Sequence, residues 1–268
     1  MRNIADAGEL GRVEFTGSQG RSLAARLDLP DAAPRAYALF AHCFTCGKDS
    51  VAAARVSRAM ARREVAVLRL DFTGLGESDG DFGNTDFSSN VEDLVRAADH
   101  LRQRFTAPAL LVGHSLGGAA VLAAARRVPE VRAVATIGAP ADPAHVAHLL
   151  AGSRAEIERT GEARVRLGGR VFRIRREFLD DIAEQPQAAR IARLGAPLLV
   201  MHAPEDELVG VENARLIFDA ARHPKSFVAL DGANHLLTAP RDAEFVAEVL
   251  AAWCGRYIGA SARAGLPE

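Results

Sequence analysis

The chain has 268 residues, of which 49% are hydrophobic and 25% are charged. This composition is typical of a globular protein and excludes a disordered, collagen-like or disulfide-scaffold chain. With 33 basic and 34 acidic residues, the formal net charge is −1. Such a chain has no overall basic field to attract nucleic acid or an anionic membrane, so we expect neither as a partner.

Cysteine usage and the N-terminal residues indicate a reducing compartment. The three cysteines, Cys43, Cys46 and Cys254, are odd in number and too few for a disulfide framework. Residues 1–10 contain acidic side chains and no apolar core, which is not the pattern of a secretory signal. No segment approaches the roughly 18 uncharged apolar residues that a spanning helix requires. We therefore expect a cytoplasmic protein, with a homodimer as one option for its assembly.

The predicted elements begin with an antiparallel edge hairpin. Its strands are residues 13–15 and 22–29, which are joined through a turn from Gly17 to Gly20. Short apolar runs then recur along the chain, and each is typical of a strand that is buried on both faces. These runs are residues 37–41, 65–68, 109–112, 131–137, 197–201 and 227–230.

Segments with helical spacing lie between most of these strands. The clearest is residues 91–105, which are preceded by Ser89. Glu92 lies three residues after Ser89, and this pair fits a capping box. Because strands and helices alternate, we predict an α/β fold with a mostly parallel sheet and helices on both faces. Residues 1–268 show no repeat and no linker, so they are predicted to form a single domain.

One insertion interrupts this alternation. From about residue 142 to about residue 194, two predicted strands are separated by about 50 residues, far more than a connecting loop requires. Within it, Gly168–Gly169 is expected to form a hairpin turn between residues 162–167 and 170–175. This hairpin places apolar side chains on one face and arginines on the other. We interpret residues 142–194 as a small cap, called the cap segment below.

The strongest chemical signal is the sequence Gly113-His-Ser-Leu-Gly117, which follows a predicted strand and runs directly into a helical pattern. A G-x-S-x-G sequence in this context is typical of a nucleophile elbow. The serine lies in a strained turn that exposes its Oγ, and the glycines allow strand and helix to pack closely. Ser115 is therefore the candidate nucleophile.

A nucleophilic serine requires a histidine as base and a carboxylate that orients the histidine. The loops at the carboxyl ends of parallel strands meet in one crevice, so both partners should follow later strands. His235 follows the last predicted strand. Asp206 follows the strand before it, between Glu205 and Glu207, and its shorter side chain suits an inward-pointing turn. Asp142 is the alternative acid.

The oxyanion of an acyl-transfer intermediate requires backbone N–H donors from the residue after the nucleophile and from the loop after an earlier strand. We predict that Leu116 and Phe44 supply them. The same loop carries Cys43 and Cys46, a C-x-x-C pair that fits either a redox motif or two small side chains in a tight turn. No second cysteine pair completes a metal site, and we expect neither a metal nor an organic cofactor.

These residues together resemble the α/β-hydrolase superfamily over residues 13–258. Gly113–Gly118 resembles the nucleophile elbow of that superfamily, and Asp71–Ser78 resembles the turn after a neighbouring strand. Residues 41–49, with 71–80 and 87–93, are similar to a bacterial subfamily that is often fused to an OsmC-type domain. The resemblance covers the hydrolase part only.

The resemblance implies a serine hydrolase with a triad of Ser115, Asp206 and His235. The sequence thus predicts a serine esterase-like enzyme that cleaves a small carboxylic ester or thioester through an acyl-enzyme. The alternative function is a thiol-redox or interaction module on the same scaffold, which would use Cys43 and Cys46. Neither the residues nor the resemblance defines the acyl chain or the leaving group.

Overall fold

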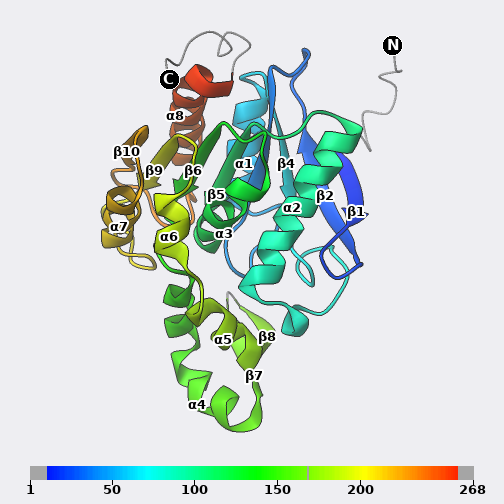
Figure 1. The fold of residues 1–268 in the computed structure, drawn as a ribbon, viewed down its shortest axis with the longest axis vertical. Coiled ribbons are helices and arrows are strands. Elements are labelled where there is room, and N and C mark those ends of the chain that lie inside the picture. Colours follow the sequence, from blue (N-terminus) through cyan, green and yellow to red (C-terminus); the bar gives the residue numbers. More distant parts are fainter. Residues whose placement is uncertain (1–10, 168, 259–268) are drawn as a thin grey trace.

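The computed structural model describes residues 11–167 and 169–258 (Figure 1). Residues 1–10, Gly168 of the predicted hairpin turn and residues 259–268 lie outside the described residues. The main sheet consists of β1 Arg12–Thr16, β2 Ser22–Asp28, β3 Ala36–Ala41, β4 Val65–Leu70, β5 Leu110–His114, β6 Ala133–Ile137, β9 Leu198–His202 and β10 Lys225–Ala229. Its strand order is β1-β2-β4-β3-β5-β6-β9-β10.

The sheet is antiparallel at its N-terminal edge and parallel elsewhere. Strand β2 pairs antiparallel with both β1 and β4, while all other neighbouring strands pair in parallel. Every residue of β4, β5, β6 and β9 is buried, as expected of strands that are covered on both faces. The predicted fold class is confirmed.

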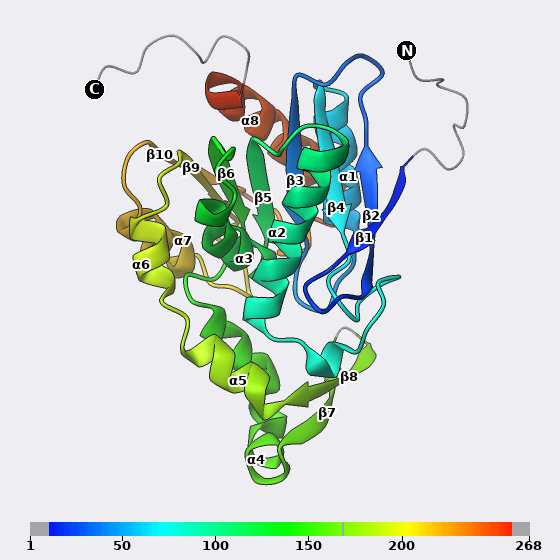
Figure 2. The same cartoon turned by 45° about the vertical axis from the view of Figure 1, so that its right-hand side comes forward.

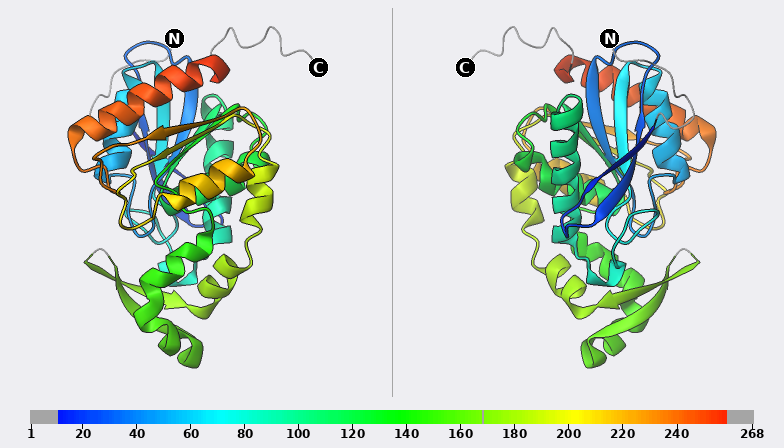
Figure 3. Two further views of the ribbon diagram at one scale, coloured as in Figure 1. Left: turned by 90° about the vertical axis from the view of Figure 1, so that its left-hand side faces the viewer. Right: turned by 90° about the vertical axis from the view of Figure 1, so that its right-hand side faces the viewer.

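Helices cover both faces of the sheet in the described part of the chain. They are α1 Val51–Ala61, α2 Phe87–Arg104, α3 Leu116–Ala124, α4 Ala151–Thr160, α5 Arg176–Ala183, α6 Gln187–Ala192, α7 Glu212–Ala220 and α8 Pro240–Ile258, with the short 3-10 helices η1 Phe82–Asn84, η2 Ala125–Arg127 and η3 Pro143–Leu150. Helices α2 and α3 lie together on one face (Figure 2), and α8 crosses the opposite face beside α1 (Figure 3). None of the helices within residues 11–167 and 169–258 is long and apolar enough to cross a membrane.

Each face of the sheet has its own apolar core. The core on the α2 and α3 side includes Leu94, Leu101 and Leu111, all fully buried. The core on the α1 and α8 side includes Met60 and Leu250. The first of these cores continues into the cap segment, whose helices α5 and α6 contact α2 and α3 respectively.

Helix α2 begins earlier than the sequence pattern indicated. Asp86 is its N-cap, because Asp86 Oδ1 accepts a hydrogen bond from Ser89 N at 2.6 Å and Asp86 N donates to Ser89 Oγ at 3.0 Å. The predicted capping box of Ser89 and Glu92 is therefore wrong. Phe87, which is fully buried, is the first helical residue and extends the apolar face by one turn.

The cap segment contains the predicted hairpin with the predicted strand limits. Strands β7 Glu162–Leu167 and β8 Arg170–Arg175 pair antiparallel in a separate sheet, and Val165 and Phe172 are buried on its apolar face. Figure 1 shows this segment at one end of the main sheet. Arg173 of β8 forms an ion pair with Asp81, on the loop before η1.

The junction between β5 and α3 is packed without room for side chains. A Cβ on Gly113 would lie 2.3 Å from Gly117 O, and a Cβ on Gly117 would lie 2.4 Å from the backbone oxygens of both Ala41 and His42. These oxygens belong to the end of β3 and the loop after it. The glycines therefore bring the start of α3 into contact with the loop that carries Phe44.

We predict that Gly117→Ala lowers the free energy of unfolding by about 1–3 kcal/mol, because the backbone atoms that its Cβ meets cannot rotate away. Gly152→Ala in α4 is the matched control, since a Cβ there meets nothing within 4 Å. The control is expected to be neutral or to stabilise by up to about 1 kcal/mol. Urea unfolding of both variants measures the difference, and equal stabilities would contradict the prediction.

Candidate active site

Ser115 lies in a strained backbone conformation between β5 and α3. Its φ of 55° and ψ of −129° fall outside the regions that residues other than glycine usually occupy. The conformation is held from both sides, because Ser115 N donates to Ile137 O at 2.9 Å and Gly118 N donates to Ser115 O at 2.8 Å. This is the strand–turn–helix geometry that the G-x-S-x-G sequence predicts.

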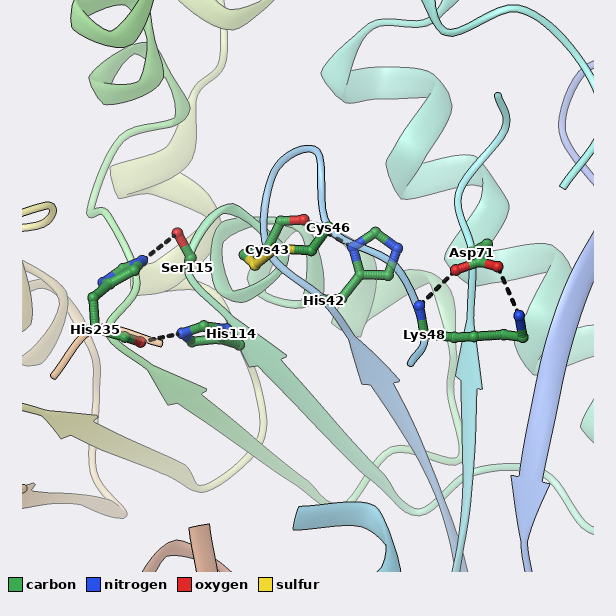
Figure 4. The surroundings of a disulfide bond; sticks show 8 residues. All are labelled: His42, Cys43, Cys46, Lys48, Asp71, His114, Ser115 and His235. Atoms are coloured by element: carbon green, nitrogen blue, oxygen red, sulfur yellow. Dashed lines mark hydrogen bonds and ion pairs between the residues drawn. A yellow bond between two sulfur atoms is a disulfide. The ribbon is translucent and has the colours of Figure 1, made fainter. Parts of the chain in front are cut away.

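A chain of hydrogen bonds joins the three residues of the predicted triad. His235 Nδ1 lies 2.7 Å from Asp206 Oδ2. His235 Nε2 lies 3.0 Å from Ser115 Oγ, a contact that Figure 4 shows. A carboxylate accepts only, so Nδ1–H donates to Asp206 and Nε2 is free to accept the Ser115 proton. The alternative acid, Asp142, is used elsewhere, because its Oδ1 accepts a hydrogen bond from Ala144 N at the start of η3.

The Asp206 carboxylate is buried and fully hydrogen-bonded. Its Oδ1 accepts from both Leu208 N and Val209 N at 2.9 Å, while Oδ2 faces His235. Burial on its own would raise the pKa of Asp206, but the hydrogen bonds from His235 and from Val209 N outweigh it and lower the pKa. The group therefore stays ionised at neutral pH and can stabilise a protonated His235.

Two further buried histidines fix the loops of this site. His114 Nε2–H donates to His235 O at 2.7 Å, and His202 Nε2–H donates to Val209 O at 2.7 Å. Burial, followed by the proximity of His235, lowers the pKa of His114 to about 4, so this ring is neutral at pH 7. His202 had no signal in the sequence, because its partner lies on a loop whose path only the fold defines.

The loop after β3 carries the two cysteines of the C-x-x-C pair. Cys43 and Cys46 are joined by a disulfide with a Cα–Cα distance of 5.4 Å, and Cys46 N donates to Cys43 O at 3.1 Å. The Phe44 ring, in the same turn, stacks on Phe178 of the cap segment at 5.4 Å. Leu116 is the first residue of α3, where backbone N–H groups have no acceptor within the helix.

A buried ion pair fixes the far end of this loop. Lys48 Nζ lies 3.0 Å from Asp71 Oδ2 and 2.8 Å from Glu77, and Lys48 N donates to Asp71 Oδ1 at 2.5 Å. Burial opposes the Lys48 charge, but the hydrogen bonds to Glu77 and Asp71 outweigh it and raise the pKa of Lys48. Figure 4 shows the disulfide turn between this ion pair and the Ser115–His235 pair.

The described residues offer no obvious metal centre. Within residues 11–167 and 169–258, no three histidine, cysteine or carboxylate side chains converge in the way that would hold a metal ion. His145 and His148 of η3 lie with their Nε2 atoms 3.2 Å apart, and the described residues supply no third ligand to this pair.

A mostly parallel sheet with a strained serine between a strand and a helix is the architecture of α/β hydrolases. Residues 38–249 match the model of the Alpha/beta hydrolase family, and the chain belongs to that family. The solved esterase domain of a Rhodothermus marinus protein is 54% identical, with a TM-score of 0.77, and the match covers 92% of this chain and 98% of that domain.

Two curated relatives are more distant. The monoacylglycerol lipase of Mycolicibacterium smegmatis is 29% identical over 240 residues, which cover 76% of this chain and 82% of the lipase. The mitochondrial palmitoyl-protein thioesterase ABHD10 of Mus musculus is 28% identical over 172 residues, which cover 62% of this chain and 57% of the thioesterase. The relatives are thus an esterase, a lipase and a thioesterase by name, and none of them supports the thiol-redox alternative.

We predict that the buried, neutral His114 makes stability fall as the pH decreases. An unfolded histidine titrates near pH 6.5, and the folded His114 only at about 4, so the unfolded state binds the extra proton between these values. From pH 7 to pH 5 this costs about 2 kcal/mol of unfolding free energy. His114→Gln, which keeps an N–H donor, should lose that part of the pH dependence in urea unfolding. Replacing the exposed His223 with glutamine should not, and equal pH profiles for both variants would refute the prediction.

Proposed function

We propose that this protein is a serine hydrolase that cleaves carboxylic esters or thioesters through an acyl-enzyme. The observation that carries the proposal is a chain of two hydrogen bonds. Ser115 Oγ lies 3.0 Å from His235 Nε2, and His235 Nδ1 lies 2.7 Å from Asp206 Oδ2, with the serine held in a strained turn. A serine without a role in catalysis requires neither a histidine as hydrogen-bond acceptor nor a buried carboxylate behind that histidine.

The reaction follows from the roles that this geometry allows. Ser115 Oγ attacks the carbonyl carbon while His235 Nε2 takes its proton. The tetrahedral intermediate collapses as the bond to the leaving oxygen or sulfur breaks, and His235 returns the proton to that atom. Water then attacks the acyl-enzyme with His235 as base, which releases the acid and restores Ser115. Asp206 holds the His235 tautomer and stabilises its charged form throughout.

The backbone N–H groups of Phe44 and Leu116 are proposed to bind the oxyanion. Gly117 supports this pairing, since its missing side chain lets the start of α3 touch the loop that carries Phe44. Such preorganised donors stabilise the transition state without reorganisation during the reaction, and each is worth about 2.7–4 kcal/mol in known cases. The disulfide closes the turn that contains Phe44, and the Lys48–Asp71 pair holds the loop two residues beyond it.

The named relatives agree with an acyl-transfer enzyme but leave the substrate open between oxygen and sulfur esters. The role of residues 142–194 as a cap, the single-domain organisation, the cytoplasmic location and the homodimer stay predictions. The decisive experiment is a series of p-nitrophenyl esters and acyl thioesters of graded chain length, combined with labelling by a fluorophosphonate probe. Turnover together with labelling that Ser115→Ala abolishes supports the proposal, and an unlabelled, inactive wild type overturns it.

We predict that Ser115→Ala and His235→Ala each lower kcat by a similar factor of about 10⁴–10⁶, and that the double variant loses little more, because triad members act as a unit. Asp206→Asn should lose about 10⁴ in kcat while the protein stays folded, because the imidazole adopts the wrong tautomer. Asp142→Asn is the matched control and should retain activity, since asparagine also serves as an N-cap. The acid assignment is wrong if Asp142→Asn is the inactive variant of the two.

A further inference from the structure

A small pocket lies beside the proposed oxyanion hole. Both Phe44 and Leu116, which are proposed to supply the two N–H donors, line it. The rest of the wall is mainly apolar and includes Phe72, Phe82 and Phe87. Among the described residues, no charged side chain contributes to this wall. An acyl chain whose carbonyl oxygen occupies the oxyanion hole therefore starts at the edge of this pocket.

Two buried polar side chains in this apolar wall lack hydrogen-bond partners. Asn90 of α2 is 6% exposed, and its Oδ1 has no partner among the described residues. His42 is 1% exposed, and its Nε2 is likewise unpaired in the described part of the chain. His42 Nδ1–H donates to Cys43 O at 2.8 Å, so Nε2 is an acceptor. Leaving such groups unpaired is costly, which indicates that something else pairs with them.

The chemistry of the wall defines what that partner is. Two acceptors require a ligand with a hydrogen to donate, and the absence of a carboxylate from the wall disfavours an ammonium group. Burial lowers the pKa of His42, which keeps its ring neutral and its Nε2 available as an acceptor. A neutral hydroxyl fits both conditions. It can donate a hydrogen bond to one acceptor and also accept one from the Asn90 side chain. Rotation of the Asn90 amide exchanges its oxygen and nitrogen, so that an N–H group takes the place of the oxygen.

The size of the pocket also favours a hydroxyl group. Its free space of about 10 Å³ is close to the room that one water molecule needs. This is enough for a hydroxyl and too little for a long chain. Leu116 and Gly117, the two residues after the nucleophile, line the same space. A hydroxyl bound there would therefore belong to the part of the acyl chain near the reacting carbonyl.

We propose that this pocket is a hydroxyl-binding subsite formed by Asn90 and His42, and that the preferred substrates are esters or thioesters of short hydroxy acids. This inference rests on the proposed serine-hydrolase function and narrows its substrate class. A site built around a hydrogen bond discriminates strongly against an analogue that lacks the hydroxyl, because the buried polar groups are then left without a partner. Asn90 acts here as a specificity-determining residue, on a helix that carries no member of the triad.

The test compares matched pairs of substrates that differ by one hydroxyl: phenyl lactate against phenyl propionate, and phenyl 3-hydroxybutyrate against phenyl butyrate. For the wild type we expect kcat/KM to be about tenfold to hundredfold higher for the hydroxylated member of at least one pair. Asn90→Leu, which replaces the amide by an apolar group of similar size, should reduce this ratio to about one. Asn84→Leu is the control, since Asn84 is exposed and lies outside the pocket.

Each result decides a separate question. A wild-type ratio near one for both pairs overturns the subsite, even where Asn90→Leu does not fold. A high ratio that Asn90→Leu leaves unchanged also overturns it, because the preference for the hydroxyl then does not depend on the Asn90 amide. A wild type that hydrolyses none of the four esters and resists the fluorophosphonate probe contradicts the serine-hydrolase function itself.

Discussion

The contact between the start of α3 and the end of β3 is the constraint on which the proposed active site depends. Two backbone oxygens occupy the space where a Gly117 side chain would lie, so any larger residue separates the elbow from the loop after β3. Leu116 lies on one side of this contact and Phe44 on the other. An oxyanion hole requires its two donors at a fixed separation before the reaction begins. Because Gly117 has no Cβ, the start of α3 can contact the end of β3, and this contact fixes the separation of the two donors.

The Lys48–Asp71 pair extends this constraint along the loop. Both side chains are almost fully buried, and Asp71 accepts hydrogen bonds from Lys48 N, Lys48 Nζ and Glu77 N. Desolvation costs several kcal/mol per ion and offsets much of the attraction in such a pair, so it is weak support for overall stability. Its directional hydrogen bonds instead fix the position of the loop. We therefore interpret the pair as a positioning device for the turn that contains Phe44.

Local sequence patterns predicted the strands, the β7–β8 hairpin and the elbow, because residue periodicity and turn glycines act between near neighbours. The convergence of strand ends also led to Asp206 and His235, which the fold brings to 2.7 Å, although their catalytic roles are still predictions. The capping box was wrong because Asp86 competes with Ser89 as the N-cap and buries Phe87. The amide oxygen of Asn90, which has no partner among the described residues, could not be predicted, since its pairing depends on which side chains share one pocket.

Phe44 connects the cap segment with the proposed hydroxyl subsite. Its ring stacks on Phe178 of α5 and lies 5.7 Å from Phe82, which in turn packs against Phe172 of β8. The aromatic side chains of the cap segment thus pack against Phe44 and Phe82, two residues that line the pocket. An acyl chain that is too long must displace these rings, whereas an acyl chain without a hydroxyl leaves Asn90 unpaired. Under the proposed function, the preference for acyl-chain length therefore depends on these aromatic rings, and the preference for a hydroxyl depends on Asn90. A substitution at one of these places can change its own preference without changing the other.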